Sequence, residues 1–596
     1  MTLRRGLRQG VLRLTLDSPG AVNVFSRDVA SMLCDQLQDL DPGAVRAVVL
    51  ESGKPGSFVN GVGLMLAGSV RAVEDAARLT GPLRDAYRAL RDCPVPTVSA
   101  IRGNCYGCGV ELALQCQYRV ASDERDTRFY MTEVADYLMI PTFGATQDLP
   151  RLLGLETATD FLLWGELWSA RRALDRGLVD ACFDPAAFDQ ELDAFVGAIA
   201  RGLRNPRRSD RPAPTASELD GIRTRTNERI RRLPPAYREL HATCFELMTA
   251  AVIQGGDAGY ERESLAAARS ALTPQSKAAT PFFFIRQAGR SLALGACPET
   301  HKIVSFAATD AGLRALSAEL AGIAGENSST SILRMIPYVA GDSAPNAPGD
   351  GRVAVSRRLG QRFDGRTGVV MHAPLRGLGI DVAEVTCGVV AFPEQQALSA
   401  ALADRYFTVL QTRPKGRFVL DDLFSAWVMP QIEYLAAGGS PRDLAESLRT
   451  FGFVRLAGDC LTGLDSAAPS DLLRQGATDG AEPAETLRAL PKSTCEGGAD
   501  DPVVMPAVLA SLGGFVARTL RDQSIRHVTF ADVAARDVLD FPLQHTSLCR
   551  YLTATRCADL LRSEATFRRL VPTENMASFE EFAARGRSFY QGHARR

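Results

Sequence analysis

Several features are missing from this sequence of 596 residues, and each absence excludes a class of protein. No apolar run approaches the length of a membrane span, so we expect no membrane-spanning segment. The basic N-terminal residues are followed by strand-like alternation rather than by the long apolar block of a signal peptide. The net charge is only −1, which gives no overall field toward nucleic acid or a membrane surface.

Paired metal-ligating cysteines are lacking as well. The thirteen cysteines are odd in number and scattered, and a single CxxC spacing joins Cys105 and Cys108. A structural zinc needs four ligands and a redox pair needs a different context, so this spacing predicts neither a metal nor a redox site. Scattered reduced thiols are typical of a cytoplasmic protein, which is the location that we expect.

The composition that remains is that of a globular protein with several domains. Hydrophobic residues make up 46% and charged residues 23%, and the chain is too long for one core. Strand-like and helix-like segments alternate over the first 200 residues, which argues for an α/β fold, and helical patterns dominate the second half. We expect an α/β domain at residues 1–200, followed by a helical linker at 201–300. A smaller strand-containing domain at 301–415 and two helical units at 416–500 and 501–596 then complete the chain.

A glycine-rich segment carries the first candidate site. GNCYGCGVELAL, residues 103–114, follows a predicted strand and leads into a helix, whose first N–H groups can hold a developing oxyanion. Glu111 lies about one turn inside that helix, and Glu133 follows in RFYMTEV. Backbone donors beside two carboxylates could polarise a carbonyl and move a proton.

These segments together resemble the enoyl-CoA hydratase/isomerase, or crotonase, superfamily. GSFVNGVGL resembles its first oxyanion loop and GNCYGCGVELAL its second, and RFYMTEV, PTFGATQDLPRLLG and ALDRGLVD follow in the family's order. The resemblance implies a crotonase-type spiral of ββα units over residues 1–200. It also implies backbone N–H donors at Asn60 and Cys108, and catalytic Glu111 and Glu133. The substrate would be an acyl thioester on CoA or on an acyl-carrier protein, with no cofactor required.

The sequence departs from the family pattern at three positions. Cys108 replaces the usual glycine, Asn60 replaces a small residue, and Gly63 stands where an aspartate is common. A cysteine keeps its backbone N–H but narrows the site. Both glutamates are retained, which favours an active enzyme over an inactive scaffold in which Glu111 only places charge at a helix N-terminus.

The second half resembles the 3-hydroxyacyl-CoA dehydrogenase part of the multifunctional α-subunit of fatty-acid β-oxidation. TPFFFIRQAGR resembles the linker before that enzyme, and VVMHAPLRGLGIDVAEVTCG resembles the region of its catalytic dyad. His372 and Glu384 keep the family's twelve-residue separation, whereas Asp421 stands where an active-site asparagine is usual. The resemblance implies a truncated Rossmann-like remnant, then mostly α-helical dehydrogenase repeats, with a thiolase-like partner for the fused subunit.

A dinucleotide site is not recognisable in this half. No GxGxxG turn follows Lys302, and about 70 residues separate His301 from His372, less than half of what the family places there. We therefore expect no NAD binding and a relic dyad at His372 and Glu384.

The combined expectation is a hydratase, dehydratase or isomerase acting on an enoyl or 3-hydroxyacyl thioester, in a specialised acyl or polyketide pathway. The chain could form an oligomer. The alternatives are a non-catalytic scaffold that binds acyl thioesters and a still bifunctional NAD-dependent enzyme of β-oxidation.

Overall fold

The computed structural model describes most of the chain, and it separates two compact units. The first unit comprises residues 1–231 and 236–280, and the second comprises residues 232–235 and 281–596. No helix among the described residues is both long and apolar enough to cross a membrane. The described residues are 3–20, 22–62, 70–203, 211–294, the six strands between 304 and 412, 418–461, and 489–590 with short gaps at 493, 496, 526, 563–564 and 586–588.

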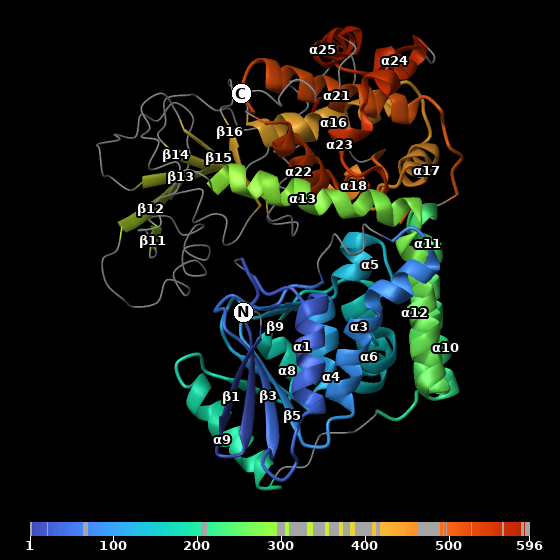
Figure 1. Cartoon of the computed structure of the whole chain (residues 1–596). Helices are drawn as coiled ribbons and strands as arrows, with labels where there is room; N and C mark the ends of the chain where they lie inside the picture. The colour runs from blue at the N-terminus through green and yellow to red at the C-terminus, as the bar shows by residue number, and fades with distance from the viewer. Residues whose placement is uncertain are drawn as a thin grey trace. The chain divides into compact units, whose positions relative to one another are not determined.

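A six-stranded sheet forms the base of the first unit (Figure 1). Its order is β1-β2-β3-β5-β7-β10, in which β1 and β2 are antiparallel and all other neighbours are parallel. The strands are β1 Leu3–Arg8, β2 Val11–Leu16, β3 Ala47–Ser52, β5 Thr97–Ile101, β7 Tyr118–Ser122 and β10 Ala181–Phe183. The helices that cover this sheet are α1 Arg27–Gln38, α3 Val73–Arg91 and α9 Phe188–Ala200.

The apolar run RAVVLES explains why β3 lies at the centre of this sheet. Ala47 and Val49 belong to the core that β3 shares with α9, whereas Val48 and Leu50 belong to the core that contains residues of α1 and α3. Successive side chains of a strand point to opposite faces, and a parallel strand covered on both faces is apolar at every position. The mixed α/β fold predicted for this part of the chain is confirmed.

A smaller sheet and three short helices carry the candidate site. The sheet order is β4-β6-β8-β9, with β4 Ser57–Val59, β6 Asn104–Tyr106, β8 Arg128–Tyr130 and β9 Trp168–Ser169. The helices are α4 Cys108–Gln115, α5 Thr132–Tyr137 and α6 Ala145–Leu153. Gly103 and Gly107 flank β6 with φ of +72° and +53°, and a Cβ on Gly103 would lie 2.1 Å from the carbonyl carbon of Gly56. Only glycine fits such a turn, which aims the first turn of α4 at the site.

The segment predicted as a linker packs largely on the first unit. Its helices are α10 Ala216–Arg231, α11 Pro235–Ile253 and α12 Asp257–Ala271. Ile222, Met248 and Ala267 lie in the same hydrophobic core as α1 and α4. The first unit therefore extends to Thr280, within α13 Pro274–Leu294, rather than ending near residue 200.

The second unit contains another six-stranded sheet, with the order β11-β12-β13-β14-β15-β16. All neighbours are parallel except β14 and β15, which are antiparallel and bring the backbone of His372 opposite that of Glu384. The strands are β11 Val304–Ala308, β12 Ser331–Pro337, β13 Arg352–Ser356, β14 Val369–His372, β15 Val382–Cys387 and β16 Thr408–Thr412. Gly63, His301 and Lys302, used in the sequence analysis, lie outside the described residues.

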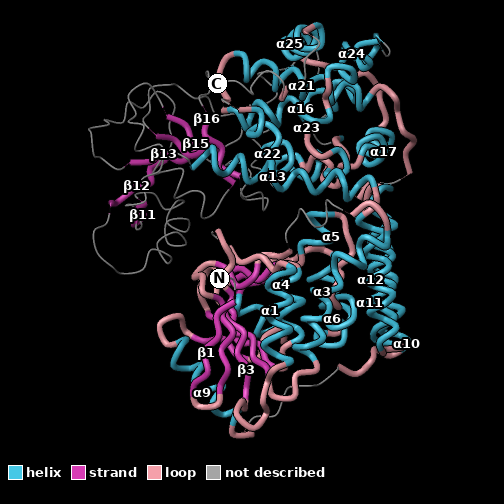
Figure 2. Tube along the Cα trace, in the orientation of Figure 1, coloured by secondary structure: helices cyan, strands magenta, loops and turns pink. Residues whose placement is uncertain are grey.

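The rest of the second unit is mostly helical, as predicted (Figure 2). The helices are α16 Val419–Ala436, α17 Pro441–Phe451, α18 Ala457–Leu461, α21 Val504–Arg521, α22 Val528–Leu539, α23 Leu548–Tyr551, α24 Ala554–Arg562 and α25 Thr573–Ala584. The long helices α16 and α21 pack against each other, and fourteen residues of α16, including Trp427, are buried. Such all-round burial is typical of a helix at the centre of a domain.

Candidate functional site

The N-terminus of α4 provides a backbone donor. Cys108 is the first residue of this helix, and its N–H has no acceptor among the described residues, as expected for the first turn. The carbonyl of Cys108 accepts a hydrogen bond of 2.6 Å from the hydroxyl of Tyr87. The thiol is buried, and burial raises its pKa well above the ordinary value, so it is a packed neutral group rather than a nucleophile.

The loop after β4 lies beside this helix N-terminus, because a Cβ on Gly109 would lie 2.3 Å from the carbonyl oxygen of Val59. The N–H predicted as the second donor, that of Asn60, instead donates to the carbonyl of Asn23 at 2.9 Å. It is engaged within the protein, and this corrects the sequence prediction. Two residues on, Val62 forms an isolated parallel bridge with Phe25, and its N–H has no acceptor among the described residues.

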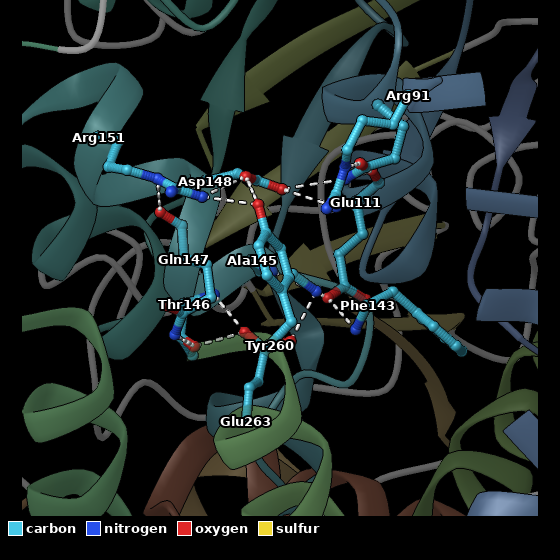
Figure 3. Close-up of polar contacts among 12 residues, drawn as sticks. Arg91, Glu111, Phe143, Ala145, Thr146, Gln147, Asp148, Arg151, Tyr260 and Glu263 are labelled. Carbon is cyan, nitrogen blue, oxygen red and sulfur yellow. Dashed lines mark hydrogen bonds and ion pairs between the residues drawn. The ribbon is translucent and has the colours of Figure 1, made fainter. Parts of the chain in front are cut away.

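Glu111 lies in the first turn of α4 and is 1% exposed. Its Oε1 accepts hydrogen bonds from the backbone N–H groups of Phe143, at 2.8 Å, and Ala145, at 3.2 Å (Figure 3). Burial, and next the nearby carboxyl of Glu133, raise the pKa of Glu111 well above its ordinary value despite these two donors. The carboxyl is thus held in one orientation and resists ionisation.

Glu133 lies in the first turn of α5, on the other side of the Gly107 turn. A Cβ on Gly107 would lie 2.4 Å from Glu133 Oε1, so the glycine gives this carboxyl its place. The Oε2 atom is buried and has no hydrogen-bond partner among the described residues. Burial raises the pKa of Glu133 to about 7, although hydrogen bonds from Thr132 act in the opposite direction. The raised pKa values of Glu111 and Glu133 both favour the protonated form of these buried carboxyls.

A third buried carboxyl, that of Glu263 on α12, was not among the residues predicted from the sequence. Its Oε1 accepts from the N–H of Gly144 at 2.6 Å, and its Oε2 accepts from the N–H of Thr146 at 2.8 Å and from the Thr146 hydroxyl (Figure 3). A signal existed in the sequence. Glu263 lies midway between Gly259 and Ala267, at helical spacing, on a face of small residues that would otherwise read as buried.

A polar network supports the same helices from the other side. Asp148 of α6 accepts hydrogen bonds from Tyr260 at 2.6 Å, from Gln115 at 3.0 Å and from Arg151 at 3.0 Å. The guanidinium of Arg91 lies 4.2 Å from the ring centre of Tyr260. This network joins α3, α4, α6 and α12, which fixes the scaffold behind Glu111 (Figure 3).

The two other predicted pairs, Cys105 with Cys108 and His372 with Glu384, lie in different units. Cys105 and Cys108 are both buried and not linked by a disulfide. In the part of the chain that the structure describes, no three His, Cys, Asp or Glu side chains come together as metal ligands. His372 and Glu384 are paired at the backbone of the antiparallel strands β14 and β15.

The first unit contains the segment that matches a known family. Residues 6–208 match the family model described as enoyl-CoA hydratase/isomerase, which confirms the resemblance for that segment. The fatty acid oxidation complex subunit alpha of Shewanella loihica is 35% identical over 210 residues, which are 35% of this chain. The chain covers 30% of the length of that relative.

Solved structures of similar proteins carry related names. An enoyl-CoA hydratase/carnithine racemase from Magnetospirillum magneticum is 23% identical with a TM-score of 0.33, over 37% of this chain and 86% of that one. An enoyl-CoA hydratase from Bacillus halodurans is 19% identical with a TM-score of 0.35, over 47% of this chain and 99% of that one.

Proposed function

We propose that the first unit catalyses the reversible addition of water to an α,β-unsaturated acyl thioester. The observation that carries this proposal is the carboxyl of Glu133, which is buried yet leaves Oε2 without a partner beside the oxyanion turn at Gly107. A buried acceptor without a partner is costly, and a substrate or water held there would satisfy it. The match of residues 6–208 to the hydratase/isomerase family supports the same reaction class.

The backbone would stabilise the charge that develops on the substrate. We assign the thioester oxygen to the N–H groups of Cys108 and Val62, in place of the Asn60 donor predicted from sequence. Both N–H groups lack an acceptor among the described residues, and the Val59–Gly109 contact holds their two segments together. Two such donors favour the enolate over the thioester, because the negative charge moves onto that oxygen.

The two glutamates would carry the protons. The water oxygen bonds to the β-carbon while one proton of the water passes to a carboxylate, and the electrons of the double bond move toward the thioester oxygen. When the enolate collapses, its α-carbon takes a proton from the carboxyl pair, so the protein returns to its starting state. These steps need one of the two carboxyls protonated and the other ionised, and burial, which raises the pKa of Glu111 well above its ordinary value and that of Glu133 to about 7, favours retention of that proton. The reverse sequence is a dehydration.

We propose further that the second unit does not act as a dehydrogenase. Dinucleotides bind open α/β sheets at the point where the strand order reverses. The six described strands β11 to β16 follow one another in chain order, so they contain no such point. The described strands therefore offer no such crevice to NAD, and His372 and Glu384 would be a structural relic.

The test is the loss of the conjugated enoyl chromophore of crotonyl-CoA when the full chain is added. We expect the wild type to turn over. Glu111→Gln and Glu133→Gln should each lower kcat by about 100-fold or more and leave KM within a few-fold. The exposed Glu261 offers a matched control, because Glu261→Gln should leave both constants unchanged. Saturable binding without turnover by the wild type would instead favour the scaffold alternative.

A further inference from the structure

We propose that Glu263 is a positioning residue for Glu111, so that α12 completes the catalytic site from outside the segment that matches the hydratase family. This inference rests on the proposed function. Glu263 holds two N–H groups of the chain segment 143–146 on which the orientation of the Glu111 carboxyl depends. No part of the family match, which ends at residue 208, contains this helix.

The hydrogen bonds alternate along four consecutive residues (Figure 3). Phe143 and Ala145 donate their N–H groups to Glu111, whereas Gly144 and Thr146 donate theirs to Glu263. These N–H groups open α6, where no intrahelical acceptor exists, so each depends on its carboxylate partner. Because one short segment is held from both sides, moving either carboxylate displaces the donors of the other.

Bulk water does not reach this side chain, because Glu263 and all four of the residues that donate the N–H groups are buried. An unpaired buried N–H is costly, so loss of the Glu263 carboxylate should shift the segment rather than leave it in place. Phe143 also stacks on Tyr87, with ring centres 4.6 Å apart, and Tyr87 donates to the carbonyl of Cys108. This stack anchors the Phe143 ring, so loss of Glu263 should act on the backbone donors of Glu111 rather than on the turn at Cys108.

Helix α12 is itself held firmly along α6. A Cβ on Gly259 would lie 2.1 Å from Gln147 Oε1, so the two helices approach as closely as a glycine allows. The hydroxyl of Tyr260 donates to Asp148, and the hydroxyl of Ser270 accepts from the N–H of Ile140 at 3.0 Å. Glu263 lies between these attachments, which is the placement of a rigid support rather than of a surface charge.

Electrostatics adds a second coupling between the two carboxyls. Burial raises the pKa of Glu263 to about 8, and its charge contributes to the raised pKa of Glu111. Asp148 and the Cys244 thiol also interact electrostatically with Glu263, while the hydroxyl of Thr146 stabilises its ionised form. Because Glu263 is ionised mainly above about pH 8, Glu263→Gln should move the pH dependence of turnover toward lower pH only in that alkaline range.

The experiment measures steady-state hydration of crotonyl-CoA by full-length variants. We expect Glu263→Gln, which keeps one acceptor oxygen, to lower kcat about 10-fold, and Glu263→Ala to lower it about 100-fold, both with KM within about threefold. Glu261→Gln, on the exposed face of the same helix, should match the wild type. In a Glu111→Gln background, Glu263→Gln should cause no further loss, because Glu263 acts through Glu111. Multiplicative losses, or a raised KM with unchanged kcat, would overturn the proposal.

Residue-resolved hydrogen exchange separates this inference from the proposed function. Glu263→Gln should accelerate exchange at Phe143 and Ala145, which Glu111 holds, as well as at Gly144 and Thr146. Acceleration confined to Gly144 and Thr146 would show that the two carboxylates act independently, and the inference would be wrong. This measurement gives its answer even if wild-type protein hydrates no thioester, in which case the proposed function alone fails.

Discussion

At the scale of single residues, three buried carboxyls lie close together in the first unit. Glu111 and Glu263 each accept at least two backbone N–H groups, whereas Glu133 keeps one oxygen without a partner among the described residues. Burying an ionisable group costs stability when it carries charge. We therefore regard Glu133 as the residue whose position is explained by function rather than by folding.

This view predicts that removing the charge of Glu133 stabilises the protein at alkaline pH. The folded-state pKa of about 7 lies above the ordinary 4.5, so the folded protein binds the extra proton between these values. Stability is therefore lost as pH rises through this window. The difference in unfolding free energy between Glu133→Gln and wild type should therefore rise in favour of the variant by roughly 2–3 kcal/mol as the pH is raised from 4.5 to 8. Urea unfolding at several pH values measures this gain.

The comparison with wild type removes a competing effect. His241 is buried with its pKa lowered to about 4, chiefly by burial, so its contribution to stability changes with the opposite sign below pH 6.5. It cancels in the difference between variant and wild type. Glu261→Gln should give a pH-independent difference near zero. A Glu133→Gln variant that is less stable at pH 8 than the wild type would show that Glu133 is a structural residue.

A second prediction at this scale separates the Cys108 thiol from its N–H. Cys108 is the first residue of α4, where proline is compatible with the helix and removes only the N–H. Cys108→Ala should keep kcat within a few-fold, because the thiol is a packed neutral group. Cys108→Pro should lower kcat by about 100- to 1,000-fold, the usual effect of deleting one oxyanion donor. Equal activity of both folded variants in the crotonyl-CoA assay would remove this N–H from the mechanism.

At the scale of elements, local patterns located most strands and helices of the first unit. VLRLTL is β2 Val11–Leu16 and YRVAS is β7 Tyr118–Ser122, because apolar residues with period two and strand-forming side chains define such segments locally. The hydrogen bond from Asn60 to Asn23 joins residues far apart in sequence, and so does the support of Glu111 by Glu263. Such long-range partners follow from tertiary packing, which spacing along one sequence does not contain.

Two glycines in helices give the prediction at this scale. Gly109 of α4 would place a Cβ 2.3 Å from the backbone oxygen of Val59, which cannot move without shifting β4. Gly81 of α3 has no atom within 4 Å of the same position. Gly109→Ala should therefore destabilise the protein and lower kcat, since it separates the two donor segments. Gly81→Ala should stabilise it by about 0.5–1 kcal/mol without changing kcat. Thermal unfolding measures the stability of the two variants, and the crotonyl-CoA assay measures their kcat. Equal stability and kcat in the two variants would contradict the close approach of Gly109 to Val59.

At the scale of the whole molecule, the boundary between the two units differs from the one that composition predicts. Residues 201–300 are expected to form a helical linker, yet α10, α12 and most of α11 belong to the first unit, and α12 supplies Glu263. A charge-rich helix such as α10 gives little periodic signal of its own, because only Ile222, Thr226 and Ile230 are buried. The unit to which α10 belongs is therefore set by the core on which it packs, not by its own sequence pattern.

The last prediction concerns the second unit and NAD. Because the described strands β11 to β16 follow chain order, they show no reversal of strand order at which a dinucleotide would bind, and the sequence after Lys302 has no GxGxxG pattern. Titration calorimetry of the full chain with NADH should give no saturable heat up to millimolar concentration, beside an NAD-dependent dehydrogenase as positive control. His372→Ala should leave hydration of crotonyl-CoA unchanged, since Glu111 and Glu133 belong to the other unit. NADH binding with a dissociation constant in the micromolar range would restore the bifunctional alternative, whether or not His372→Ala abolishes that binding. The cofactor site would then have formed without a change of strand order.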